Sequence, residues 1–176
     1  LGTEIIPAQK YDTPEAALEG FVDTISSGAT LSDFASTMPL PERRLLSIYG
    51  PAFSQSVDGA MDVFEVSESA FSSEIVDGVG RVQIDSLVLP EAQIEIQGIC
   101  ATSVDYYGDE QRNCLDEVPV LDRLGVKDVR LIAVQEDGGW LFGPLATVGD
   151  IGGIFVKNFV TYYNEDRLEE LFDMGY

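Results

Sequence analysis

The stretch Asp12-Thr13-Pro14-Glu15-Ala16-Ala17-Leu18-Glu19-Gly20-Phe21 carries the signals that begin the first helix of the chain. Thr13 suits the cap position, Pro14 suits the first helical position, and Glu15 complements the helix dipole. Apolar residues then recur at helical spacing on one face as far as the stop at Gly28: Ala17, Leu18, Phe21, Val22 and Ile25. The stretch therefore predicts an amphipathic helix at the start of a folded domain.

Two shorter helices are expected next, and the apolar period then changes from helical to alternating. Thr30 can cap a helix that runs towards Pro39, and a further helix is predicted over residues 41–49. From Met61 onward the alternation predicts strands over residues 63–66, 70–75, 81–89, 94–102, 126–136 and 140–142. Helices followed by antiparallel strands predict an α+β fold, with the N-terminal helices packed on a curved antiparallel sheet and a C-terminal helix.

The length and composition fit one folded unit. The chain has 176 residues, of which 45% are apolar, so it can bury a core and is too apolar for a disordered acidic segment. We expect a linker or arm over residues 1–11 and an α+β domain over residues 12–147. A C-terminal helical extension is expected over residues 148–176, where an apolar stripe beyond Asn164 either packs on its own domain or docks on another chain.

The charge is strongly negative and uneven. The chain has 31 acidic and 10 basic residues, a net charge of −21, and residues 61–120 alone carry −11. This balance argues against nucleic acid, which needs clustered Lys and Arg, and against an anionic membrane surface. The excess can keep a surface soluble, adapt the protein to high salt, or form a face for a basic partner.

The absence of histidine restricts the possible chemistry. It excludes Ser-His, Cys-His and His-metal arrangements, so carboxylates are the remaining candidates for a general base. No spacing in the sequence selects a catalytic set, and we assign no catalytic residue, metal ligand or cofactor.

Cys100 and Cys114 are the only two cysteines, and they flank a plausible hairpin turn at Gly108-Asp109. Such a hairpin would bring the thiols together, and a disulfide there indicates an oxidising, extracytoplasmic compartment. The alternative is two unrelated buried thiols. The chain begins with Leu1 rather than Met, so we expect that an upstream segment was removed, and no segment of the chain itself is apolar enough to insert into a membrane.

Two stretches resemble nuclear transport factor 2-like domains, the cystatin-type cone. One is Asp12–Phe21 with the later Pro41-Glu42-Arg43-Arg44, and the other is the Val134–Val148 segment around Glu136-Asp137-Gly138-Gly139-Trp140. Together with the cysteine hairpin, the pattern is most similar to extracytoplasmic, membrane-tethered actinobacterial proteins of unknown function. The resemblance covers roughly residues 12–155, and Gly143 stands where the family would have serine.

The resemblance implies an apolar pocket between helices and sheet. We expect four aromatic residues to line it: Phe34, Tyr49, Phe53 and Trp140. Some cone domains are enzymes, and an isomerase-like mechanism would need a carboxylate base such as Asp23 or Asp33 with Tyr49 as a donor.

Other candidate ligand sites are weaker. The acids between Asp105 and Glu117 could bind calcium, but Gly108 comes too early for an EF-hand loop. The pairs Tyr106-Tyr107 and Tyr162-Tyr163 suit protein or glycan contacts if they are exposed. We therefore expect a non-enzymatic binding or interaction module of the cell envelope, whose partner is an unknown protein or envelope ligand. A homodimer, a small-molecule enzyme and a structural subunit of an envelope complex stay open.

Overall fold

The computed structural model describes residues 4–28, 30–52, 65–90, 92–105 and 107–173. Its α-helices are α1 (Pro14–Ser26), α2 (Leu31–Ser36), α3 (Leu40–Tyr49), α5 (Pro119–Arg123), α6 (Pro144–Asn164) and α7 (Leu168–Phe172). Three short 3-10 helices are η1 (Gly50–Ala52), η2 (Leu115–Glu117) and η3 (Val126–Asp128). The strands are β1 (Glu68–Val76), β2 (Val79–Leu89), β3 (Ile94–Gln97), β4 (Cys100–Val104), β5 (Glu110–Cys114), β6 (Leu131–Glu136) and β7 (Gly139–Phe142).

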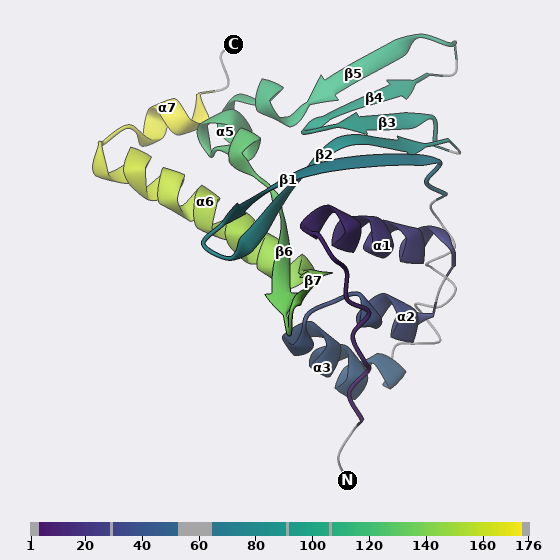
Figure 1. Ribbon diagram of the computed structural model, residues 1–176. Coiled ribbons are helices and arrows are strands. Elements are labelled where there is room, and N and C mark those ends of the chain that lie inside the picture. The colour runs from purple at the N-terminus through teal and green to yellow at the C-terminus, as the bar shows by residue number, and fades with distance from the viewer. Residues whose placement is uncertain (1–3, 29, 53–64, 91, 106, 174–176) are drawn as a thin grey trace.

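The seven strands form one antiparallel sheet, so the predicted α+β class with a C-terminal helix is confirmed. The strand order is β5-β4-β3-β2-β6-β7, and β1 pairs with the other edge of β2. Figure 1 shows α1, α2 and α3 below the long β1–β2 pair, with α6 along the outside of the molecule. Two of the tight turns, at Asp77-Gly78 and Asp137-Gly138, have positive φ at both residues, as type I′ hairpins require.

The main core lies between α1 and the sheet. It holds six buried side chains from α1, β2, β6 and β7: Ala17, Leu18, Val82, Ala133, Trp140 and Phe142. Phe21 of α1 meets Phe142 edge-on, with ring centroids 4.5 Å apart. Thr13 caps α1 as predicted, since its hydroxyl accepts a hydrogen bond from the Ala16 amide at 3.2 Å. The helix therefore directs its apolar face at the sheet.

A buried arginine ties the N-terminal helices to the sheet. Arg43 of α3 donates to the backbone oxygens of Ile6 and Met38 and forms an ion pair of 2.6 Å with Glu136 of β6. The second oxygen of Glu136 accepts from the Leu40 amide at 2.8 Å, at the start of α3. One side-chain network thus joins the N-terminal arm, α3 and β6.

Two predicted strands differ from the structure. The strand expected over residues 94–102 is two strands, β3 and β4, joined by a turn in which Gly98 has a φ of +59°. The strand expected over residues 126–136 begins only at Leu131, because Gly125 has a φ of +87° and is followed by η3. Of the strand expected over residues 63–66, the first two positions lie outside the described residues and the last two are not in a strand.

The C-terminal helices pack on the rest of the domain. Leu171 of α7 is fully buried, and Arg123 of α5 donates to its backbone oxygen at 3.3 Å. The apolar stripe of the tail therefore covers its own domain at this point, and α6 already begins at Pro144. No described helix combines the length and apolar character that a membrane span requires.

Candidate functional site

The sheet forks along one edge of β2, and the fork holds an apolar cavity. On that edge β6 pairs with residues 79–82 of β2, whereas β3 pairs with residues 87–89. Between the two pairings, the Gly98 amide at the β3–β4 turn donates to the Ile84 oxygen at 2.7 Å. The fork leaves a cavity of about 320 Å³, which we call the fork pocket. Its lining residues are Val82, Gln83, Ile84, Gly98, Ile99, Leu115, Lys127, Val129, Arg130 and Leu131.

The fork pocket combines apolar walls with two of the ten cations of the chain. Arg130 donates to the backbone oxygens of Lys127 at 2.9 Å and of Val129 at 2.7 Å. No carboxylate of the described residues forms an ion pair with Arg130, whereas Lys127 pairs with Asp122 at 3.0 Å. The hydrogen bond to Asp122 raises the pKa of Lys127. Arg130 is thus the cation left to meet a polar group of a ligand.

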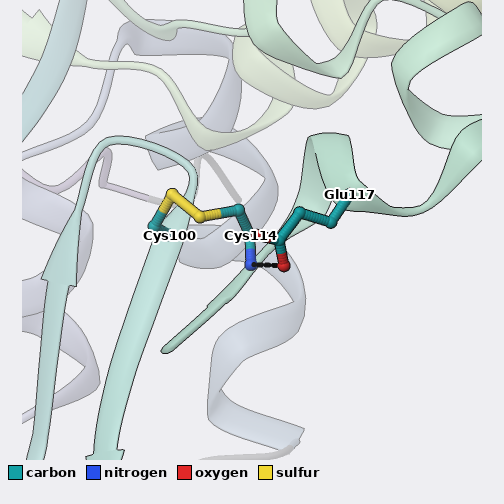
Figure 2. Close-up of a disulfide and its surroundings, with 3 residues drawn as sticks. All are labelled: Cys100, Cys114 and Glu117. Atoms are coloured by element: carbon teal, nitrogen blue, oxygen red, sulfur yellow. Dashed lines mark hydrogen bonds between the residues drawn. A yellow bond between two sulfur atoms is a disulfide. The ribbon is translucent and has the colours of Figure 1, made fainter. Parts of the chain in front are cut away.

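The disulfide holds one wall of the fork pocket. Cys100 of β4 and Cys114 of β5 are directly opposite in the antiparallel register and are bonded, so the predicted pairing is confirmed. Their neighbours Ile99 and Leu115 both line the pocket, and the Leu115 amide donates to the Ile99 oxygen at 3.1 Å. Figure 2 shows the disulfide beside Glu117, whose carboxylate accepts from the Cys114 amide at 3.2 Å.

Two of the acidic residues between Asp105 and Glu117 accept backbone hydrogen bonds. One oxygen of Asp105 accepts from the amides of Tyr107 and Asp109, and Glu117 caps η2. Among the described residues, one group of three potential metal ligands converges: Cys100, Cys114 and Asp116. Its two sulfur atoms are bonded to each other, so they offer no thiolate to a metal.

The two carboxylates considered as general bases lie apart from the fork pocket. Asp33 completes the capping box of α2, where it accepts from the amide and hydroxyl of Thr30, and these bonds lower its pKa. Asp23 is exposed on α1, and Tyr49, the proposed donor, is exposed on α3. The structure does not bring these three side chains together at any of the cavities it describes.

A buried carboxylate that the sequence did not single out is Glu42 of α3. It accepts a hydrogen bond from the Leu145 amide at 3.1 Å and so caps the start of α6. Burial raises the pKa of Glu42, although the backbone hydrogen bonds from Leu145 and Ala146 act in the opposite direction. Glu42 therefore fixes α6 to α3. Only its place in the Pro41-Glu42-Arg43-Arg44 stretch could have drawn attention to it.

The aromatic residues expected to line a pocket have different surroundings. Trp140 is buried in the main core, and the ring of Phe34 packs 5.1 Å from the ring of Phe21. Tyr49 is exposed, and Phe53 lies outside the described residues. The fork pocket is lined by other side chains. One sequence signal could have indicated the fork pocket: Lys127 and Arg130 are two cations within four positions of a strongly acidic chain.

The tyrosine pairs also separate. Tyr107 is strongly exposed at the β4–β5 turn, and Tyr106 lies outside the described residues. Tyr162 lies beneath the guanidinium of Arg167, 5.0 Å from the ring centroid, whereas Tyr163 faces outward from α6. The three described tyrosines of these pairs therefore have different surroundings.

A second cavity, of about 450 Å³, lies along α6 and is polar. Arg81 of β2 and Asp150 of α6 form an ion pair of 3.3 Å at its wall. The other oxygen of Asp150 is buried and has no hydrogen-bond partner among the described residues.

Comparison with protein-family models, with curated proteins and with solved structures gave no match.

Proposed function

We propose that this chain is a non-enzymatic binding module of the cell envelope that works outside the cytoplasm. The observation that carries the proposal is the fork pocket, because an apolar cavity with a single available cation is the usual form of a small-molecule site. Its volume suits a short aliphatic or aromatic ligand that carries one oxygen acceptor. Arg130 would meet that oxygen, and Ile84, Ile99 and Leu115 would cover the apolar part.

The placement of the carboxylates supports binding rather than catalysis. No carboxylate is among the described residues that line the fork pocket. The buried carboxylate of Glu42 is engaged by backbone amides at the start of α6, and Asp33 is engaged by Thr30. A general base needs an oxygen within reach of a bound substrate, and neither of these carboxylates lines the fork pocket.

The disulfide supports a location outside the cytoplasm, where such bonds persist. The cystatin-type cone is our proposal for the fold family. It is supported by the packing of α1 on the face formed by β1, β2, β6 and β7, and by the predicted cap and hairpin turns. An upstream tether is part of the same proposal.

The binding proposal is tested by titrating the protein with sodium octanoate and following methyl NMR signals. We expect saturable shifts of the Ile84, Ile99 and Leu115 methyl groups, with tighter binding of octanoate than of octanol. Arg130→Met should remove that preference, whereas Arg112→Met, on exposed β5, should leave it intact. Absence of saturable shifts with both probes would overturn the binding site. Alkylation of both cysteines before reduction, in protein taken from its own cells, would overturn the location.

A further inference from the structure

The outer face of α6 is apolar and carries no charge. Eight positions lie within an arc of about 120° when successive residues are placed 100° apart. They are Leu145, Val148, Gly149, Gly152, Val156, Phe159, Val160 and Tyr163, and we call them the α6 face. Spacings of three and four residues over the whole helix make this a continuous stripe rather than scattered apolar residues.

The α6 face is exposed along its full length. The exposed fractions are 58% for Leu145, 66% for Val148, 63% for Val156 and 63% for Tyr163. A β-carbon added at Gly149 or Gly152 would meet nothing within 4 Å, so the described residues leave these positions open as well. Figure 1 shows α6 on the outside of the molecule, with β6 and α7 on its inner side.

This face is electrically unlike the rest of the protein. The chain has a net charge of −21, yet α6 contains one acid and one base, Asp150 and Lys157. Both lie on the flank beside the polar cavity, where Asp150 pairs with Arg81. A second copy would therefore meet less repulsion here than at the acidic sheet.

The sizes of the residues change along the face. The two glycines lie in its N-terminal half, whereas Val156, Phe159 and Val160 lie in its C-terminal half. We propose that the α6 face pairs antiparallel with the α6 face of a second copy, about a twofold axis near residue 154. This register places Phe159 over Gly149 and Val156 over Gly152, so that large side chains fill the space above the glycines.

The available area is enough for such a dimer. Six apolar side chains whose exposed fractions run from 40% to 66% offer on the order of 500 Å² per copy, taking roughly 80 Å² for each. Both copies together then bury about 1,000 Å² of apolar surface, which is the lower bound for a specific interface. The helix is roughly 31 Å long, so the pairing extends along the molecule. We therefore expect a concentration-dependent dimer.

Analytical ultracentrifugation of the full chain, from micromolar to millimolar concentration, tests the dimer. We expect a monomer–dimer equilibrium that Phe159→Glu weakens roughly thirtyfold or more, as for a central anchor of an interface. The control is Ile75→Glu, which introduces the same charge at an exposed apolar residue of β1, away from the α6 face. A monomer throughout the range, or equal effects of both variants, would overturn the proposal.

A glycine pair separates dimerisation from folding. Gly152→Leu places a side chain at the centre of the α6 face, whereas Gly153→Leu makes the same change on the flank, and both positions are open in the monomer. Both variants should fold at least as well as the parent, because leucine favours a helix over glycine. Only Gly152→Leu should weaken the dimer, and equal association of both variants would contradict the close approach.

The antiparallel register is tested by a charge pair. Val148→Glu and Val160→Lys should each weaken the dimer, and the double variant should recover most of it because the two charges face each other between copies. Failure of the double variant to recover would overturn this register. Co-sedimentation of the parent, but not of Phe159→Glu, with phosphatidylcholine vesicles would instead assign the α6 face to a lipid surface.

Discussion

Replacing Arg43 with methionine should lower the free energy of unfolding by about 3 kcal/mol. The side chain of Arg43 is 5% exposed and donates to two backbone oxygens and to Glu136, whose side chain is 21% exposed. Removing one partner of a buried ion pair costs roughly 3–5 kcal/mol, since the other charge stays behind. Glu136 keeps some contact with water, so the lower end of this range applies.

Urea unfolding followed by tryptophan fluorescence measures this change. Trp140 is the only tryptophan and is buried in the main core, so its emission reports the loss of the packed sheet. A loss of about 3 kcal/mol corresponds to a drop in Tm of roughly 6–12 °C for a chain of this length. The matched control is Arg44→Met, because Arg44 is the exposed neighbour of Arg43 on the same helix, and its loss should change stability by less than about 0.5 kcal/mol.

A second variant distinguishes the effect of the unpaired Glu136 charge from the effect of the lost Arg43 packing. Glu136→Gln keeps an oxygen for the Leu40 amide and removes the negative charge. Added to Arg43→Met, it should recover about 1–2 kcal/mol, because a neutral amide replaces the half-buried carboxylate that the Arg43 variant leaves without a cation. If Arg43→Met costs no more than Arg44→Met, or if Glu136→Gln makes the Arg43 variant less stable still, the network does not hold the arm, α3 and β6 together.

Three further predictions concern the disulfide, Glu42 and Tyr11. Reduction of the Cys100–Cys114 bond should lower the free energy of unfolding by about 3 kcal/mol, measured by urea unfolding with and without a reductant. Because the pKa of Glu42 is raised in the folded protein, the folded protein binds this proton more tightly than the unfolded chain does. The stability that results is present in acid and is lost as the pH rises through the folded pKa. Urea unfolding at acidic and neutral pH should therefore show Glu42→Gln gaining stability relative to the parent as the pH rises. Tyr11→Phe should leave stability unchanged or raise it by about 1 kcal/mol in a thermal melt, because the buried Tyr11 hydroxyl has no hydrogen-bond partner among the described residues.

Local signals were enough to predict elements whose ends are set by their own residues. The Thr13 cap, with Pro14 beside it, begins α1, and the Asp137-Gly138 turn joins β6 to β7, as the sequence indicated. In contrast, residues 94–100 largely alternate between apolar and polar, which predicts one strand, and Gly98 was the only local sign that the chain reverses there. The reversal is favoured by pairing with β2, which is a tertiary contact.

The fork pocket could not be predicted from the sequence, because it also depends on tertiary contacts. Its walls come from β2, the β3–β4 turn and the segment around Arg130, which meet only because β3 and β6 share one edge of β2. The burial of Arg43 could not be predicted from the sequence either. Its helix pattern places it in a charged run with Glu42 and Arg44, and only the backbone oxygens of Ile6 and Met38 make its burial favourable.

The position of the disulfide follows from where the core ends. The buried cluster lies under α1, against β2, β6 and β7, whereas four of the five residues of β5 are exposed. Such a strand cannot gain enough from apolar burial to offset the entropy of ordering its backbone. Glu110 and Arg112 also place charge on an edge strand, which discourages pairing with another chain but adds no packing. A covalent bond at the Cys100–Cys114 pair therefore replaces the missing apolar contacts, and the wall of the fork pocket depends on it.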